Sequence, residues 1–431
     1  MKSHLKGKIG EDAVSEIAER TYLKYWCYPN PKDELKDKKE ICDLLIIFKQ
    51  SILIISVKNY TFKGNYERYF RTTIDKAISQ IHGAERKLFN SGYAVKFNHP
   101  VKGEFEFDSS KFKSIHRLII NLSTVPNFYT GGAHTSKGKY IHVFNWFAFL
   151  KVVTELNTIR DLIDYFTERE NTFNSKQLIM LAGKDEDWTI DTQLEFLKYT
   201  KNLDQSKNPF ILFSGTELDL LATYLFNGRK FNRNFYEEKY NGAFMEYDGK
   251  WDEYISKEEV KRKKGADRIS YFIDEFIERE VLHYNDDHRI ELATEMLSFS
   301  RFERRIIGKQ FFDFLDKHRR SSNNTIARRY GEINGMIIAF FIHGEAINAQ
   351  QAMHLMQIAV DGYSYWEKYK TQKIIMIGCD TKITQFKFAF VNKIEPFSDE
   401  YEKELIADLK LLNWFNNIKK INFHSKEYPD E

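Results

Sequence analysis

The stretch ICDLLIIFKQSILIISVKNY (residues 41–60) consists of two strongly apolar runs that meet at a short polar segment, residues 49–51. Runs of this length that are rich in isoleucine and separated by a few polar residues are typical of a buried β-hairpin. The two runs predict strands over about residues 41–48 and 52–58. The segment therefore favours a hairpin in the core of the protein.

Two ionisable residues lie in this apolar hairpin, Asp43 in the first run and Lys58 at the end of the second. Burial of an unpaired carboxylate or ammonium costs several kcal/mol, so such residues are usually paired, metal-bound or catalytic. On paired strands about 4.8 Å apart, Asp43 and Lys58 can point into one cleft. Ser56 shares the face of Lys58, whereas Val57 points away and leaves its carbonyl oxygen available as a ligand.

These groups meet the needs of a metal-dependent phosphodiesterase. A divalent cation that holds a phosphate oxygen and a water molecule requires hard oxygen ligands. A nearby lysine can stabilise the charge that develops on the phosphate or help to deprotonate the attacking water. The structural alternative is a salt-bridged aspartate and a lysine whose ammonium group reaches solvent. For either residue alone we favour this alternative, and for the whole combination we favour the catalytic interpretation.

The elements around the hairpin predict an order of helix, three strands, helix and strand. A helix is expected over about residues 9–21, and the aromatic segment 22–28 is expected to be the first strand. Residues 29–40, with two prolines and many charges, are expected to form an exposed loop. An amphipathic pattern predicts a helix over residues 71–89, and an apolar run predicts a strand over residues 114–123.

The remainder of the chain predicts two further regions. We expect residues 1–175 to form the first domain and residues 176–265 a mainly helical connecting region. The charge run SKEEVKRKKGADR (256–268) is the best boundary. After it, strand-like and helical segments alternate, so residues 266–431 are expected to form an α/β domain with a sensing, specificity or oligomerising role.

A basic helix is predicted within this last domain, over residues 302–320. Its basic residues and those that follow it could bind phosphates; they are Arg304, Arg305, Lys309, Lys317, Arg319, Arg320, Arg328 and Arg329. Acidic residues are interspersed on the same helix, so we favour a solvated, ion-paired face over a phosphate site.

The element order, together with Gly10-Glu11, Asp43 and Ser56-Val57-Lys58-Asn59, resembles the PD-(D/E)xK, or restriction-endonuclease-like, nuclease superfamily. The similarity is greatest to its nuclease-related domain (NERD) and Mrr-like groups. These groups have a Gly-Glu pair at the start of the first helix, an acid in an apolar strand and a strand ending in x-Val-Lys-Asn. The resemblance covers roughly residues 5–125 and extends more loosely to 175. It implies an αβββαβ nuclease core in a mixed α/β (α+β) protein.

Residue by residue, the resemblance implies that Glu11 and Asp43 are acidic metal ligands and that the Val57 carbonyl completes the set. It implies that Lys58 is the catalytic lysine. Gln80, in the helix after the hairpin, resembles the glutamine that related nucleases place beside this lysine, where it could orient water or phosphate. The implied cofactor is Mg²⁺, and Mn²⁺ is expected to be able to replace it.

Ser56 departs from the family pattern, which has an acid two residues before the lysine. Serine is a poor magnesium ligand compared with a carboxylate. Some restriction enzymes of the superfamily have Ser-x-Lys here and supply the acid from elsewhere. Glu11 is the first candidate for that acid, and Glu67 and Glu85 are weaker candidates. The alternative is a catalytic site that has decayed.

The resemblance thus implies a metal-dependent DNA endonuclease that hydrolyses phosphodiester bonds in bacterial anti-phage defence or restriction. Cutting both strands of a duplex usually needs two sites, so we expect a homo-oligomer; any partner protein in a defence system stays open. RNA is the weaker alternative as a substrate. The second hypothesis, motivated by Ser56, is a catalytically decayed nuclease fold that acts as a nucleic-acid-binding or interaction module.

Composition predicts a cytoplasmic protein without a membrane partner. No run of about 18 apolar residues is present, as a transmembrane helix would need, and the start MKSHLKGKIGED lacks the apolar region of a signal peptide. The three scattered cysteines suit unpaired thiols in a reducing compartment. The net charge of +3 is too small to indicate a nucleic-acid partner by itself.

Overall fold

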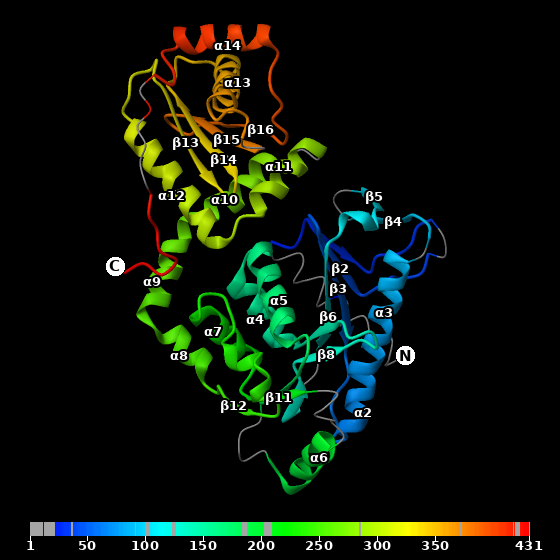
Figure 1. Cartoon of the computed structure of the whole chain (residues 1–431). Helices are drawn as coiled ribbons and strands as arrows, with labels where there is room; N and C mark the ends of the chain where they lie inside the picture. Colours follow the sequence, from blue (N-terminus) through cyan, green and yellow to red (C-terminus); the bar gives the residue numbers. More distant parts are fainter. Residues whose placement is uncertain are drawn as a thin grey trace. The chain divides into compact units, whose positions relative to one another are not determined.

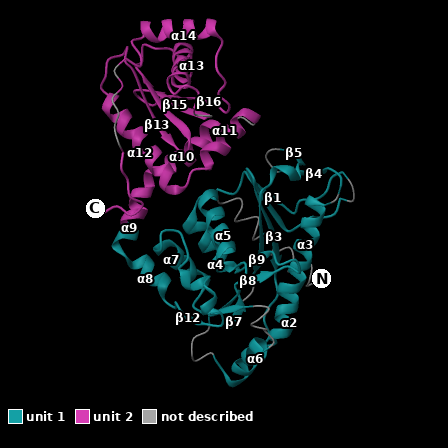
Figure 2. Ribbon diagram, in the orientation of Figure 1, with its two compact units in different colours: residues 1–261 teal, residues 262–431 magenta. Residues whose placement is uncertain are grey.

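The chain forms two compact units, residues 1–261 and 262–431 (Figure 2). The structure is a computed structural model, and it describes residues 12, 22–35, 38–90, 92–99, 103–122, 126–182, 188–201, 209–283, 286–370, 373–416, 418 and 423–430. Both units contain helices and sheets, which confirms the predicted mixed α/β class. Among the described residues, no helix combines the length and the apolar character needed to cross a membrane.

A six-stranded sheet forms the centre of unit 1 and contains the predicted hairpin. In spatial order its strands are β1 (Cys27–Pro29), β2 (Leu44–Phe48), β3 (Ser51–Lys58), β6 (Ser114–Asn121), β9 (Tyr140–Asn145) and β8 (Gly132–His134). Strands β1, β2 and β3 are successively antiparallel, β6 and β9 continue parallel to β3, and β8 is antiparallel to β9. Phe48 pairs with Ser51, so the hairpin turn consists only of Lys49 and Gln50.

A helical rod of three segments packs on one face of this sheet (Figure 1). The segments are α2 (Tyr66–Phe70), the π-helical turn η1 (Arg71–Asp75) and α3 (Lys76–Phe89). In α3 the buried residues Ala77, Ile81, Ala84 and Leu88 recur every three or four positions and join the core of the sheet. The predicted helix over residues 71–89 is confirmed, and α2 extends it at its N-terminus.

Two further helices, α4 (Trp146–Leu156) and α5 (Ile159–Phe173), pack against β9. Neighbouring residues of β6 reach opposite faces of the sheet, because side chains alternate along a strand. Arg117 bonds to Glu85 of α3, whereas His116 bonds to Glu170 of α5. The sheet therefore lies between α3 on one side and α5 on the other.

The N-terminal part departs from the predicted elements in two ways. Residues 22–26 form turns in place of a strand, because Leu23 and Trp26 are buried by packing while the backbone bond from Trp26 N–H to the Leu23 carbonyl closes a turn. An unpredicted hairpin, β4 (Val95–His99) and β5 (Gly103–Phe107), followed by the short 3₁₀ helix η2 (Ser109–Lys111), precedes β6. The predicted helix over residues 9–21 lies outside the described residues, apart from Asp12, which is helical.

Unit 1 also contains a second sheet, of four strands. Their order is β12 (Phe244–Glu246), β11 (Phe210–Ser214), β10 (Gln177–Leu181) and β7 (Phe128–Thr130), and all but β7 are parallel. The helices of this part are α6 (Ile190–Lys201), α7 (Glu217–Phe226), α8 (Lys250–Ser256) and the 3₁₀ turns η4 (Arg233–Phe235) and η5 (Glu238–Tyr240).

This second sheet changes the predicted division of the chain. Residues 176–265, expected to be a mainly helical connection, supply three strands that join β7 from the expected first domain, 1–175. Unit 1 ends at residue 261, within α9 (Glu258–Ala266), near the boundary expected at 265.

Unit 2 is built on a four-stranded sheet with helices on both faces. Its strands, in spatial order, are β13 (Ile326–Ile333), β14 (Met336–His343), β15 (Lys373–Asp380) and β16 (Phe386–Val391). Its helical segments are η6 (Asp267–Ser270), α10 (Tyr271–Phe276), η7 (Ile277–Val281), α11 (Asp287–Leu297), α12 (Arg301–His318), α13 (Ala349–Trp366) and α14 (Asp399–Leu411). Strand β14, helix α13 and the parallel strand β15 match the strand–helix–strand pattern that the sequence predicts.

Three arginines of α12 are buried and paired. Arg301 and Arg304 bond to Asp274, and Arg305 contacts Asp267 at 3.2 Å. The predicted ion pairing is found, but the predicted solvated face is wrong for these arginines, because they point into unit 2 and Arg304 is fully buried. The pairs fix α12 against α10 and η6, and they remove these arginines from any phosphate site.

Candidate active site

Asp43 and Ser56 face each other where β2 begins and β3 ends. The register pairs Leu44 with Ile55, which places Asp43 opposite Ser56. The Ser56 hydroxyl lies 3.1 Å from Oδ2 of Asp43, and the backbone N–H of Val57 donates to the same oxygen. The hairpin geometry therefore holds the Asp43 carboxylate at the end of the sheet.

Lys58 and Gln80 complete the site from the end of β3 and from α3. Nζ of Lys58 donates to Oγ of Ser56 (2.8 Å), to the Val57 carbonyl (3.3 Å) and to Oε1 of Gln80. The Ser56 hydroxyl also lies 3.1 Å from Oε1 of Gln80, so its single proton has two acceptors, this amide oxygen and the Asp43 carboxylate. The structure thus brings together Asp43, Ser56, Val57, Lys58 and Gln80.

The ammonium group of Lys58 donates its hydrogen bonds to uncharged acceptors. Its three acceptors are a hydroxyl, a backbone carbonyl and an amide oxygen. Burial lowers the pKa of Lys58, the carboxylates of Asp43 and Glu40 oppose that shift, and the Lys76 ammonium adds to it. Such a lysine releases its proton more readily than an exposed one, and its ammonium forms no direct ion pair with a described residue.

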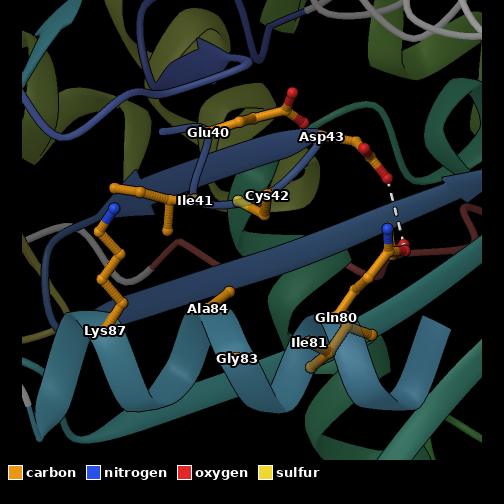
Figure 3. A pocket seen from close by; sticks show the side chains of 10 residues that line it. Glu40, Ile41, Cys42, Asp43, Gln80, Ile81, Gly83, Ala84 and Lys87 are labelled. Atoms are coloured by element: carbon orange, nitrogen blue, oxygen red, sulfur yellow. Dashed lines mark hydrogen bonds between the residues drawn. The ribbon is translucent and has the colours of Figure 1, made fainter. Parts of the chain in front are cut away.

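A pocket of about 360 Å³ opens beside these groups (Figure 3). Glu40 and Asp43 lie on its hairpin side, and Gln80 extends toward Asp43 from α3. Gly83 and Ala84, further along the same helix, also line it and have no side chain long enough to fill the space. Small residues on α3 therefore keep the carboxylates accessible to a ligand.

Glu40 is the site residue that the sequence reasoning missed. It is exposed, lines the pocket together with Asp43, and lies close enough to Lys58 to influence the pKa of the lysine. A backbone bridge to Lys32 fixes its position at the end of the charged loop. The available signal was the spacing Glu-x-x-Asp (residues 40–43) at the start of the first apolar run, which places a second acid close to Asp43.

The other acids considered as substitutes for the missing carboxylate have different placements. Glu11 lies outside the described residues. Glu85 is buried and receives two hydrogen bonds of 2.9 Å from Arg117 and a third bond from Lys139. Burial opposes its ionisation, but these bonds lower the pKa of Glu85 to about 2. Glu67 is exposed in the first turn of α2, and neither Glu67 nor Glu85 lines the pocket.

The donor atoms at the pocket suit a hard divalent cation. Asp43 and Glu40 offer carboxylate oxygens and Gln80 an amide oxygen in the pocket lining, and the Val57 carbonyl lies beside them, within 3.3 Å of Nζ of Lys58. Oxygen donors of these kinds are the ligands that Mg²⁺ and Mn²⁺ prefer. The residues present therefore fit the metal that the resemblance implies.

A separate cluster that could hold a metal consists of His116, His142 and Glu170, from β6, β9 and α5. Both imidazoles contact the same carboxylate oxygen, at 2.9 and 3.0 Å, and the second nitrogen of His116 bonds to Ser114. These distances are those of hydrogen bonds, and burial lowers the pKa of His142 to about 4. Hydrogen bonding of both imidazoles to one carboxylate accounts for this cluster, so we assign it a structural role.

Comparison with known proteins gives no match: no family model, no curated protein and no solved structure matches the chain. The resemblance to PD-(D/E)xK nucleases therefore stays a prediction. The features that bear on it are the order of β1, β2, β3, α3 and β6, and the meeting of Asp43, Val57 and Lys58 at one end of the sheet.

Proposed function

We propose that unit 1 is a metal-dependent DNA endonuclease that hydrolyses phosphodiester bonds. The observation that carries this proposal is the convergence of Asp43, Lys58 and Gln80 around Ser56 beside an open pocket. A purely structural aspartate and lysine would gain most by bonding to each other. Here each is held through Ser56, and both Ser56 and Asp43 line the pocket.

Each of these residues has a separate role in the proposed hydrolysis. Asp43 and Glu40, with the Val57 carbonyl, would hold the cation. Bound there, Mg²⁺ supplies a Lewis acid for the phosphate and lowers the pKa of water. Lys58 stabilises the extra negative charge on the phosphate or accepts a proton from the attacking water, for which its lowered pKa is suited. Gln80 orients the water or the phosphate beside Lys58.

The substrate class follows from the resemblance and from exposed cations next to the site. Arg71 and Lys76 are exposed on the helical rod that carries Gln80, and Lys87 lines the far part of the pocket. Such side chains can contact the phosphates of a duplex without reading its sequence. We propose bacterial anti-phage defence or restriction as the biological role and a homo-oligomer as the cutting form.

Cleavage of a supercoiled plasmid in Mg²⁺ or Mn²⁺ tests the proposal. Asp43→Asn and Lys58→Met are each expected to reduce the rate by at least about 100-fold, because each removes a charge that acts in the transition state. Glu106→Gln is the matched control, because it removes an exposed carboxylate on β5 of the same unit. Cleavage that survives in both variants would show that the activity belongs to another centre.

The second candidate function is a nucleic-acid-binding module without catalysis. Ser56 favours it, because a carboxylate is missing from the position where the related pattern has one. Wild-type protein that binds duplex DNA and cleaves neither DNA nor RNA in either metal would support this candidate. Cleavage of RNA alone would instead identify RNA as the substrate of the same site.

A further inference from the structure

A cavity of about 850 Å³ in unit 2 lies along β13 and is also lined by residues of α12, α13 and the segment after α14. This volume is in the range of pockets that bind small molecules. None of the residues that we assign to the proposed nuclease site lines it. Its chemistry is therefore a separate question from the function of unit 1.

Arg328 of β13 has its guanidinium in this cavity. The group lies over the rings of Trp414 (4.1 Å) and Phe415 (5.1 Å), and it makes no hydrogen bond or ion pair with the side chain of any described residue. Burial lowers its pKa. Aromatic packing fixes the face of a guanidinium and leaves its in-plane N–H groups to donate, which is the geometry that binds phosphate through two parallel bonds.

Tyr363 of α13 supplies a second unused polar group in the same cavity. The side chain is 1% exposed, and its hydroxyl has no hydrogen-bond partner among the described residues. The Arg328 guanidinium lies close enough to influence the pKa of this hydroxyl. A buried hydroxyl without a partner costs free energy, so an acceptor atom on a ligand would stabilise it.

Further basic side chains line the same cavity. Lys317 and His318 of α12 line the cavity together with Arg329, whose guanidinium bonds to Gln310 and lies over Phe314. Burial lowers the pKa of His318, and the positive charges of Lys317 and Arg329 lower it further. Among the described lining residues the one acid is Glu332, which is exposed. The cavity therefore favours an anion.

The apolar part of the lining indicates what else the ligand carries. Phe314, Tyr330 and Phe415 present aromatic rings to a cavity that is much larger than a phosphate ion. Planar rings stack on such side chains, and this contribution is nearly independent of the identity of the base. A ligand that joins a phosphate to a planar ring would use both parts of the lining.

We propose that unit 2 binds a nucleotide in this cavity, with its phosphate on Arg328 and Tyr363 and its base against the aromatic side chains. Calorimetric titration of the full chain with AMP, GMP, CMP and UMP tests this. At least one monophosphate is expected to bind with a Kd below about 1 mM. The matching nucleoside and inorganic phosphate are each expected to bind at least about 10-fold more weakly.

Variants connect that binding to the cavity. Arg328→Gln is expected to weaken the monophosphate by about 10- to 100-fold and Tyr363→Phe by about 3- to 10-fold, because a charged and a neutral donor are lost. Arg320→Gln, which removes an exposed arginine outside the cavity, is the control and is expected to bind as the wild type does. Thermal unfolding reports whether each variant is folded. If Arg328→Gln is not folded, the binding measured with Tyr363→Phe decides the test.

Three results would overturn the proposal. These are no binding of any of the four monophosphates, binding that is unchanged in both cavity variants, or inorganic phosphate binding as tightly as the nucleotide. Because the readout is binding and not cleavage, its failure is distinct from failure of the proposed nuclease.

Discussion

At position 56 a serine hydroxyl links an acid and a base, Asp43 and Lys58, without adding a charge. Ser56 contacts Asp43 at 3.1 Å and Lys58 at 2.8 Å, and an acid at this position would place a second negative charge beside Asp43. In the proposed site the second acid is Glu40, on the loop before β2. Its position on the surface allows a charge there without the cost of burial.

Replacement of Glu40 by glutamine tests whether this carboxylate helps to hold the metal. Loss of one carboxylate is expected to raise the Mn²⁺ concentration for half-maximal cleavage by about 10-fold or more, and the melting temperature is expected to stay the same because the side chain is exposed. Rates measured over a metal titration check this. Glu34→Gln, in the same loop, is the control, and an unchanged metal requirement in the Glu40 variant would remove Glu40 from the site.

Sequence reasoning reached Val57 and Lys58 because they lie on a strand whose alternation fixes their faces. It reached Asp43 as an acid within an apolar run and Gln80 through the family resemblance. It could not reach Glu40, because a loop has no period and a charge in a loop is expected to be solvated. Arg328 was noticed only as one of several basic residues. Its packing on Trp414 depends on a contact across 86 positions of the chain, which no local pattern encodes.

Among the elements, α5 and α7 are joined by a buried ion pair. Nη1 of Arg169 donates to Oε1 of Glu217 at 2.8 Å, Tyr165 donates to the same oxygen at 2.6 Å, and Nη2 of Arg169 donates to the Gly131 carbonyl. Gly131 lies between β7 and β8, which belong to different sheets. This network therefore connects both sheets of unit 1.

Removal of one partner from this network should destabilise unit 1. Glu217→Ala is expected to lower the free energy of unfolding by about 3–5 kcal/mol, because the Arg169 charge would remain buried without its carboxylate. Urea unfolding measures the difference. Arg160→Ala breaks an exposed pair with Asp164 and is expected to cost less than about 1 kcal/mol; similar losses in both variants would contradict a special role for the buried pair.

The elements were predictable to different degrees for physical reasons. The hairpin, α3 and β14–α13–β15 have long periodic patterns, and the structure confirms them. Strands β10 and β11 were missed, because each has only five residues between helical stretches, and short apolar runs do not distinguish a strand from a buried helix turn. The turns at 22–26 were taken for a strand, because aromatic residues pack equally well outside a ladder.

At the scale of the whole molecule, acid should unfold the protein through unit 1. Burial lowers the pKa of His142 from its usual 6.5 to about 4, so the unfolded chain binds more protons and stability falls as the pH drops from 6.5 through 4. Burial opposes the ionisation of Glu170, but bonds from His116 and His142 lower its pKa to about 2. The stability from Glu170 is present above pH 4.5 and is lost as the pH falls through 2.

His142→Gln separates these contributions. The amide can still donate to Glu170 but does not titrate, so the free energy of unfolding is expected to change less between pH 6.5 and 4, by up to about 1.4 kcal/mol per pH unit. Urea unfolding at a series of pH values checks this. His82→Gln, on the exposed face of α3, is the control; an identical pH dependence in the His142 variant and the wild type would refute the assignment.

The two units should also fold separately. Each has its own sheets among the described residues, and the core formed by α13, α14, β14 and β15 lies within unit 2. A fragment of residues 258–431, which keeps α9 whole, is expected to unfold in one cooperative thermal transition followed by circular dichroism. A fragment without such a transition would show that unit 2 depends on unit 1.

The π-helical turn η1 has a consequence for how the chain can change in length. It holds one more residue per turn than an α-helix. The side chains before it are therefore rotated by about 100° about the helix axis relative to the side chains after it. Before it, Tyr66 stacks on Phe128 of the second sheet; after it, Ile81 and Gln80 meet the core and the pocket of the first. Deleting a single residue from 71–75 would restore a uniform helix and turn one of these faces away from its partner. We therefore expect the number of residues in this rod to be fixed, because an insertion or a deletion would rotate one part of the rod relative to the other.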